Sequence, residues 1–277
     1  MRVFVVDAFA AGPGTGNPAA VCPIDGPAFP PAHVLQRLAA QHNLSETAFY
    51  HPLDTAPGAF ALRWFTPEQE VDLCGHATLA AAFVALVLDK LRGGAATFHT
   101  KSGALTVRLL EDGSLELDFP SRPPAPVPAA AVPPALFEAL GLPSSAARFV
   151  GKARDYLVVV DTEAQVRALR PDHGKLAAID ALCVVVSARG EGGFDVVSRV
   201  FCPACGVPED PVTGSAHCTI VPYFCELLGK RELRCAQVGA RGGELRAVLR
   251  EGGQRVAMAG RASLYLRGEI EAAALAE

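Results

Sequence analysis

The stretch Arg63-Trp-Phe-Thr-Pro67, followed by Asp72-Leu-Cys-Gly-His-Ala-Thr78, decides the fold, because a second version of it lies half a chain away. The second version is Arg199-Val-Phe-Cys-Pro203, followed by Glu209-Asp-Pro-Val-Thr-Gly-Ser-Ala-His217. Each version predicts an Arg-x-Phe-x-Pro strand, a loop with an acidic residue, a glycine and then a helix of small residues. We therefore expect two similar halves.

The glycines of the two versions, Gly75 and Gly214, are predicted to begin helices. The first N–H groups of a helix have no partner within the helix, and they attract anions. If both helices begin at a shared site, the two ends would form a binding pocket for a carboxylate.

Composition limits the class of protein. Half of the 277 residues are hydrophobic, 19% are charged and the net charge is −4, so the chain can bury a large core. No run of Lys or Arg favours a nucleic-acid partner. The longest apolar stretch, Ala77–Leu88, is too short to cross a membrane. Met1-Arg-Val-Phe-Val-Val-Asp7 predicts a strand from the first residues, and we expect no signal peptide there. We expect a cytoplasmic protein with no membrane partner.

Eight cysteines in a chain of this size and class favour thiols over disulfides. The C-x-x-C pair Cys202 and Cys205 has no second pair or His pair nearby, so we expect small residues in a buried loop rather than a redox or zinc site. No metal site is predicted. Five further cysteines lie in apolar runs and are expected to fill the core: Cys22, Cys183, Cys218, Cys225 and Cys235.

The predicted elements indicate an α+β fold. Short strands cluster around two apolar helices, Ala77–Lys90 and Ser215–Leu228, with no regular βαβ alternation. No glycine-rich nucleotide motif is present. Seven prolines make Pro120–Pro134 a linker, which predicts domains at 1–122 and 123–277, with the last strand able to pack back on the first domain.

Glu46 is a candidate for proton transfer. It lies in Asn43-Leu-Ser-Glu-Thr-Ala-Phe-Tyr50 and opens a predicted apolar strand. Partial burial would raise its pKa and suit it to general acid/base chemistry near neutral pH. Taken alone, this octapeptide is also compatible with Ser45 and Glu46 in a surface turn, and it favours that alternative.

His76 follows Gly75 at a helix start, where the helix dipole disfavours the imidazolium. A neutral His76 could donate to or accept from a substrate, or it could be a helix-capping or satisfied buried histidine. Asp72 is expected to cap this helix, and Thr213 could cap the second one.

Asp210 could hydrogen-bond a substrate or share a proton with His76, or it could occupy an Asp-Pro corner. Asn17, in Gly16-Asn-Pro, is a polar residue at a strand entrance, and an Asn-Pro turn is its alternative. Cys74 precedes the first glycine and could be a reactive thiol. A two-thiol racemase would need a matching cysteine before Gly214, and Pro211, Val212 and Thr213 stand there instead, so Cys74 is expected to be structural.

Together these stretches resemble the PhzF (phenazine biosynthesis) family of isomerases. The matching stretches follow in order along nearly the whole chain: Val6-Asp-Ala-Phe9, Gly16-Asn-Pro-Ala-Ala-Val-Cys22, Asn43-Leu-Ser-Glu-Thr-Ala-Phe49, Arg63-Trp-Phe-Thr-Pro67, Val71-Asp-Leu-Cys-Gly-His-Ala-Thr78, Asp118-Phe-Pro120, Glu209-Asp-Pro-Val-Thr-Gly-Ser-Ala-His-Cys218 and Arg241-Gly-Gly243.

The resemblance implies a fold similar to that of diaminopimelate epimerase. That fold has two pseudo-symmetric α+β domains, each a mostly antiparallel sheet wrapped around a buried central helix, with the active site between them and homodimers common. It implies that Glu46 is the general acid/base of a cofactor-independent proton shift. His76, Asp210 and Ser215 match substrate-lining positions, and Gly75 and Gly214 match the helix starts that receive the substrate carboxylate. In the best-known member the substrate is trans-2,3-dihydro-3-hydroxyanthranilate, a cyclic amino acid.

The sequence therefore predicts an isomerase (EC 5.-) that acts on a small carboxylate. Glu46, His76 and Asp210 are its expected catalytic residues, and the expected substrate-binding residues are Asn17, Gly75, Gly214 and Ser215. Two alternatives stay open: a non-catalytic metabolite-binding or interaction protein on the same fold, and, less favoured, the thiol racemase.

Overall fold

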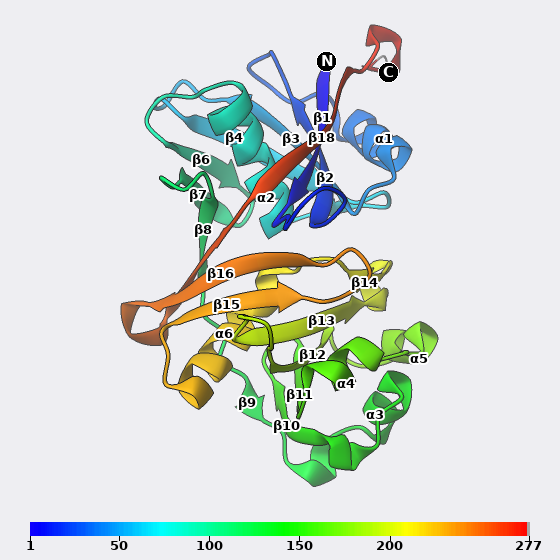
Figure 1. The fold of residues 1–277 in the computed structure, drawn as a ribbon. Helices are drawn as coiled ribbons and strands as arrows, with labels where there is room; N and C mark the ends of the chain where they lie inside the picture. The colour runs from blue at the N-terminus through cyan, green and yellow to red at the C-terminus, as the bar shows by residue number, and fades with distance from the viewer. Residues whose placement is uncertain (276–277) are drawn as a thin grey trace. The chain divides into compact units, whose positions relative to one another are not determined.

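The computed structural model describes residues 1–275 (Figure 1). The chain forms two compact units. Unit 1 is Met1–Asp118 together with the segment from Ala259 on, and unit 2 is Phe119–Met258. Within the described residues, no helix is long and apolar enough to cross a membrane.

The elements of unit 1 begin with strand β1 and end with β18, which returns from the far end of the chain. They are β1 Arg2–Ala8, β2 Asn17–Pro23, α1 Ala32–His42, β3 Glu46–Pro52, β4 Ala59–Phe65, β5 Glu70–Val71, α2 Gly75–Phe83, β6 Ala95–Thr100, β7 Gly103–Leu109, β8 Leu115–Pro120 and β18 Ala262–Glu269. A π-helical turn, Val84–Leu88, continues α2.

The strands of unit 1 pair in the order β18-β1-β2-β3-β4-β6-β7-β8. Only β2–β3 and β4–β6 in this series are parallel. Helix α2 contacts β18, β1, β2, β3 and β7, so the sheet wraps around it. Seven of its nine residues are buried, as expected for a helix that is apolar on nearly all sides. Figure 1 shows β18 beside β1, although they lie at opposite ends of the sequence.

Helix α1 covers the outer side of the unit 1 sheet. Its apolar stripe, Val34, Leu35, Leu38 and Ala39, has helical spacing and is buried. That stripe packs in one cluster with Phe49 of β3 and Phe65 of β4. Burial of such side chains stabilises the fold by roughly 1.5–3 kcal/mol each.

The elements of unit 2 comprise the second buried helix, α6, and a sheet covered by shorter helices. They are β9 Ala125–Pro126, α3 Pro134–Leu140, β10 Ala147–Lys152, β11 Tyr156–Val160, α4 Glu163–Ala168, α5 His173–Ala177, β12 Val184–Arg189, β13 Val196–Cys202, β14 Val207–Asp210, α6 Gly214–Leu228, β15 Glu232–Gln237, β16 Gly243–Arg250 and β17 Arg255–Gly260.

The sheet of unit 2 follows the order β9-β10-β11-β12-β13-β15-β16, with β14 also paired to β13. Its parallel pairs are β11–β12 and β13–β15. Helix α6 packs on β15 and β16, while α4 and α5 pack on β12 and β13. The mostly antiparallel pairing and the single buried helix of each unit confirm the predicted α+β class.

The sequence repeat is a structural repeat. In each unit the helix connects two parallel strands, β4 to β6 across α2 and β13 to β15 across α6. Arg63 forms a bidentate ion pair with Glu70 at 2.8 and 2.9 Å, and Arg199 forms the same pair with Glu209 at 2.7 Å for both bonds. Each guanidinium also lies 5.1 Å from the ring of the phenylalanine two residues on. The repeated arginine therefore fixes the short strand that leads into the helix.

Several elements differ from the prediction. The expected linker contains β9, which pairs with β10, and the helices α4 and α5 were not predicted. Both helices are short, six and five residues, and they depend on side-chain caps from Thr162 and Asp172. Local caps of this kind produce no long apolar period in the sequence.

Candidate active site

Five polar residues from three segments meet in unit 1. Glu46 is the first residue of β3 and Ser45 precedes it, while Asn17 is the first residue of β2. Cys74 and His76 flank the first residue of α2. Because β2 and β3 are parallel neighbours, with Ala19 opposite Glu46, their first residues lie at one edge of the sheet, beside the start of α2.

His76 is the centre of this cluster. Its Nε2 lies 3.2 Å from a carboxylate oxygen of Glu46 and 3.4 Å from the hydroxyl of Ser45. Its Nδ1 lies 3.3 Å from the amide nitrogen of Asn17 and 3.5 Å from the sulfur of Cys74. The Ser45 hydroxyl also donates to the Asn17 side-chain oxygen at 3.2 Å, so the amide is held on both sides.

The cluster is largely shielded from solvent. The side chain of Glu46 is 17% exposed and that of His76 is 7% exposed, and Asn17 is fully buried. The surface-turn alternative for Glu46 is therefore wrong, and so is the Asn-Pro turn for Asn17, which lies in a strand.

The ionisation of the pair differs from the sequence-based expectation. Burial alone would raise the pKa of Glu46, but the charge of His76 and hydrogen bonds from His76, Ser45 and Cys74 lower it below its ordinary value. Burial would likewise lower the pKa of His76, but hydrogen bonds with Cys74 and Glu46 and the charge of Glu46 raise it well above 6.5. The expected raised pKa of Glu46 and the expected neutral His76 are both wrong, because each group has the other as its partner.

Cys74 takes part in the cluster, which the sequence analysis did not foresee. Its thiol is buried, and its pKa is raised by burial and by the charge of Glu46, so it is protonated near neutral pH. Glu46 is therefore the negative neighbour of His76 over that range. The thiol can donate a hydrogen bond to the carboxylate, which is a contact and not only packing.

The start of α2 is not capped by a side chain. Cys74 occupies the N-cap position without a side-chain hydrogen bond to the helix, and Asp72 is exposed and lies 3.8 Å from Lys101. The predicted Asp72 cap is therefore wrong. The backbone N–H groups of Gly75 and His76 at this helix start are potential donors to an anion.

The second helix start, in unit 2, is held by a separate network. Thr213 is its N-cap residue, but the Thr213 hydroxyl donates to a carboxylate oxygen of Asp210 at 2.5 Å instead of capping the helix. The backbone N–H of Thr213 donates to the side chain of Gln237 at 2.9 Å, and the Gln237 amide donates back to the Asp210 carbonyl. Asp210 is thus fixed at the end of β14, four residues before Gly214, and Gln237 is a positioning residue that the sequence did not indicate.

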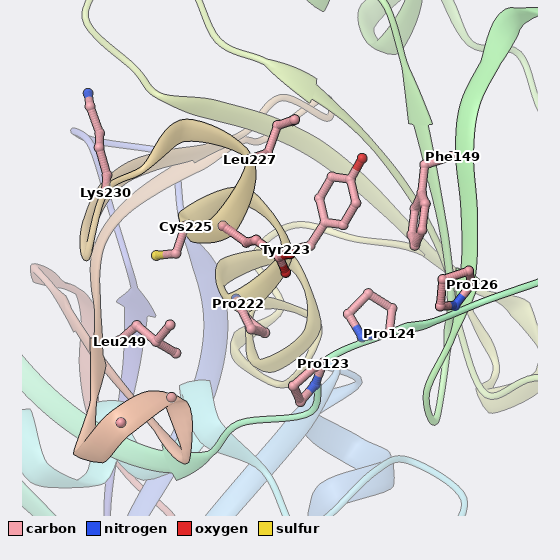
Figure 2. A pocket seen from close by; sticks show the side chains of 13 residues that line it. Pro123, Pro124, Pro126, Phe149, Pro222, Tyr223, Cys225, Leu227, Lys230 and Leu249 are labelled. Atoms are coloured by element: carbon pink, nitrogen blue, oxygen red, sulfur yellow. The ribbon is translucent and has the colours of Figure 1, made fainter.

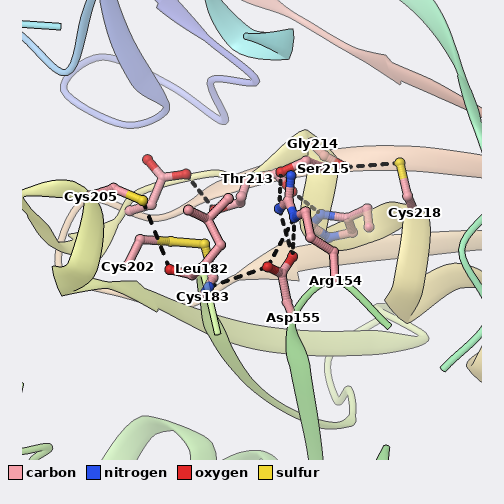
Figure 3. A network of polar contacts seen from close by, with 12 residues as sticks. Arg154, Asp155, Leu182, Cys183, Cys202, Cys205, Thr213, Gly214, Ser215 and Cys218 are labelled. Atoms are coloured by element: carbon pink, nitrogen blue, oxygen red, sulfur yellow. Dashed lines mark hydrogen bonds and ion pairs between the residues drawn. A yellow bond between two sulfur atoms is a disulfide. The ribbon is translucent and has the colours of Figure 1, made fainter. Parts of the chain in front are cut away.

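Ser215 has a cationic neighbour. The Arg154 guanidinium donates to the Ser215 hydroxyl at 3.0 Å and to the carboxylate of Asp155 at 2.6 Å (Figure 3). Asp155 is only 1% exposed, whereas Arg154 is 30% exposed. Arg154 therefore neutralises a buried carboxylate and places a positive charge at the helix start. No motif in the sequence signals this, because the contact between Arg154 and Ser215 spans 61 residues.

Gly214 is not required by the fold of unit 2. Its φ does not lie in the left-handed region, and a Cβ added there would meet only the sulfur of Met258, at an ordinary 3.9 Å. A glycine that the backbone does not need, at a helix start, is typical of a position where a ligand approaches the main chain.

Two of the predictions about the cysteines are wrong. Cys183 and Cys202 form a disulfide, with Cα atoms 4.4 Å apart, so Cys183 is not a thiol that fills the core. Cys205 is exposed rather than part of a buried loop. Cys22, Cys218, Cys225 and Cys235 are buried thiols, as expected.

Two further features bear on ligands. Among the described residues, the ligand atoms of Glu46, Cys74 and His76 lie within 4.8 Å of one another, so this cluster could also hold a metal ion such as Zn²⁺. A pocket of about 660 Å³ lies in unit 2 between the proline segment and the C-terminal half of α6, with the rings of Phe149 and Tyr223 on its wall (Figure 2). None of the predicted site residues lines that pocket.

The comparisons with known proteins agree with this architecture. The family profile of phenazine biosynthesis-like proteins, PhzC-PhzF, matches residues 6–268. The chain belongs to the PhzF family. An uncharacterized isomerase of Pseudomonas aeruginosa is 48% identical to it over 272 residues, which cover 98% of each protein. The sequence-based assignment to a family of isomerases is confirmed.

Solved structures support the fold in detail. A PhzF family protein of Enterococcus faecalis matches with a TM-score of 0.89 and 39% identity over 98% of both chains. A probable proline racemase of Agrobacterium radiobacter matches with a TM-score of 0.60 at 10% identity, covering 98% of this chain and 93% of that one. The second likeness, at this low identity, shows that the two chains share a fold.

Proposed function

We propose that this PhzF family member is a cofactor-independent isomerase that moves a proton between two carbons of a small carboxylate, with Glu46 as the general acid/base. The observation that carries the proposal is the shielded pair of Glu46 and His76 at 3.2 Å, directly beside the start of α2. The pair joins a proton-transfer group to N–H donors that suit a substrate carboxylate.

The electrostatics of the pair fit this role. A carboxylate whose pKa lies below its ordinary value is the ionised base across the neutral range. Once Glu46 has taken a proton from a carbon next to the substrate carboxylate, it is the stronger acid for that same reason, which favours return of the proton to a second carbon. The helix N–H groups would stabilise the negative charge that develops on the substrate carboxylate between the two steps.

The remaining residues would position these groups. Asn17 and Ser45 hold the ring of His76, and the thiol of Cys74 donates toward Glu46. In unit 2, Asp210 and Ser215 are proposed to bind polar groups of a substrate, and Gly214 to receive a carboxylate at the main chain. That one substrate meets both helix starts stays a prediction, as does a proton shared between Asp210 and His76.

The alternative is a protein that binds small carboxylates without turnover. Both functions predict binding, so the test needs two readouts on the same compounds. The purified protein would be screened against small carboxylic acids and cyclic amino acids by thermal shift, and each stabilising acid would then be incubated in ²H₂O and followed by NMR. We expect at least one acid to raise the unfolding temperature and also to gain deuterium on carbon. Stabilisation without deuterium incorporation by any acid would favour the binding protein.

A metal ion on Glu46, Cys74 and His76 would occupy the same groups. The exchange assay is therefore repeated after dialysis against EDTA and after addition of Zn²⁺. A proton shift carried by Glu46 alone predicts an unchanged rate after chelation and inhibition by Zn²⁺. Loss of exchange after EDTA and recovery with Zn²⁺ would contradict the metal-independent mechanism.

A further inference from the structure

Three cysteines lie together at one end of strands β12 and β13 in unit 2. Val184 of β12 pairs with Phe201 of β13, and the Cys183–Cys202 disulfide occupies the next position of that antiparallel ladder. Cys205 ends the 3₁₀ turn Pro203–Cys205, which begins directly after Cys202. Its sulfur lies 3.9 Å from the carbonyl of Leu182, the residue before Cys183. The Cys205 thiol therefore lies close to the disulfide. It is three residues after Cys202 along the chain and beside Leu182, the residue that precedes Cys183 (Figure 3).

Exposure distinguishes the three. Cys183 and Cys202 are buried, 5% and 6% exposed, whereas Cys205 is exposed along with its neighbours Ala204 and Gly206. The thiolate is the nucleophile in disulfide exchange, and access to solvent is one of the conditions for its reactivity. The disulfide is thus shielded from external thiols, while the adjacent thiol is open to them.

We propose that Cys183, Cys202 and Cys205 form a thiol–disulfide modification site in which Cys205 is the exposed thiol that opens the buried disulfide. In the exchange step, the Cys205 thiolate attacks the sulfur of Cys202. A Cys202–Cys205 bond forms, the Cys202–Cys183 bond breaks, and Cys183 leaves as a thiolate that takes a proton from water. The step needs no oxidant, because one disulfide replaces another.

An external dithiol completes the reduction. It attacks the exposed Cys202–Cys205 bond, and its own sulfurs end as a disulfide while Cys202 and Cys205 become thiols. Hydrogen peroxide reverses the change, because two thiols and one hydrogen peroxide give one disulfide and two molecules of water.

The disulfide is connected to the start of α6 by a chain of contacts. The backbone N–H of Cys183 donates to Asp155 at 3.2 Å, Asp155 accepts from Arg154, and Arg154 donates to Ser215. Cys202 is also the last residue of β13, which a short turn joins to β14, and Asp210 is the last residue of β14. Opening the Cys183–Cys202 bond would therefore loosen the supports of Ser215 and of Asp210. That this changes substrate binding rests on the proposed function, whereas the thiol chemistry does not.

Disulfide mapping tests the chemistry. The protein is purified without reductant, blocked with N-ethylmaleimide at intervals after addition of dithiothreitol, and digested for mass spectrometry. We expect both the Cys183–Cys202 and the Cys202–Cys205 bonds in the wild type. Reduction of Cys183–Cys202 should be at least several-fold slower in Cys205→Ser but unchanged in Ala204→Ser, a control in the same exposed turn. An equal rate in all three proteins would overturn the role of Cys205, and maleimide on both Cys183 and Cys202 after peroxide treatment would overturn the site itself.

Amide hydrogen exchange tests the connection without any substrate, so its result is independent of the isomerase proposal. We expect residues 210–217 to exchange several-fold faster after reduction, with helix α2, residues 75–83, unchanged as an internal control. The same comparison in Cys183→Ala, which cannot form the bond, should show fast exchange under both conditions. Equal exchange of residues 210–217 in oxidised and reduced wild type would contradict the coupling.

Discussion

At the scale of single residues, Glu46 and His76 each change the ionisation of the other. From the sequence alone, burial is expected to raise the pKa of Glu46, and the helix dipole is expected to disfavour the imidazolium of His76. Neither expectation takes the other residue into account. Thirty positions separate them, so nothing local in the sequence encodes the contact of 3.2 Å that reverses both expected shifts. The same holds for the thiol of Cys74, which the sequence could not place beside a carboxylate.

The raised pKa of His76 can be measured directly. We expect NMR of the ring to show that His76 stays protonated well above pH 6.5 in the wild type. In Glu46→Gln the midpoint should fall, because the negative partner is gone. A wild-type midpoint at or below 6.5 would contradict the ion pair.

The pair also sets a pH window for stability. The raised pKa of His76 gives stability that is present below 6.5 and is lost as pH rises through the folded-state value. The lowered pKa of Glu46 gives stability that is present above 4.5 and is lost as pH falls. The difference in unfolding free energy between wild type and His76→Gln should therefore be greatest between pH 4.5 and pH 6.5.

Gly214 separates a binding role from a folding role. In Gly214→Ala the added Cβ has room, so we expect the free energy of unfolding to change by less than about 1 kcal/mol. Affinity for the carboxylate found in the screen should fall at least tenfold, measured by calorimetry. The control is Gly12→Ala, where a Cβ also has room and no ligand is proposed. Equal affinity in both variants would argue against carboxylate binding at Gly214.

At the scale of elements, the sequence predicted most strands and both buried helices, since these have the clearest apolar patterns. The roles of the acidic residues in the repeat were predicted less well. Asp72 was expected to act at the first helix, but the acid that pairs with the repeated arginine is Glu70, whose pKa Arg63 lowers to about 2. The pairing is decided by the side-by-side position of β4 and β5, which spacing alone does not determine.

The repeated arginine pair should stabilise its unit. Arg199 is buried and also donates to the Leu169 carbonyl, so its guanidinium cannot easily reorient toward solvent when the Glu209 carboxylate is removed. We expect Glu209→Gln to lower the free energy of unfolding by roughly 1–3 kcal/mol in denaturant titration. Asp161→Asn removes an exposed pair with Arg148 and should leave stability unchanged. Equal effects of both substitutions would contradict the role of the repeat.

At the scale of the whole molecule, the order of motifs along the chain was enough to predict the family. The disulfide was not predictable in the same way, because Cys183 and Cys202 face each other only through the register of β12 and β13. The size of the chain predicts free thiols. The register of β12 and β13 nevertheless brings Cys183 and Cys202 close enough to form a disulfide.

A homodimer stays a prediction from the family resemblance. Light scattering coupled to gel filtration should give twice the chain mass of 28.9 kDa at micromolar concentration. The mass of a single chain at that concentration would contradict it.

The central claim is that Glu46 carries the proton, and the most direct measurement is deuterium incorporation into the substrate identified by the screen. We expect Glu46→Gln to lower the rate by about 10²–10⁴-fold, while Glu68→Gln, an exposed glutamate of the same unit, leaves it unchanged. Exchange in Glu46→Gln at the wild-type rate would show that another group moves the proton.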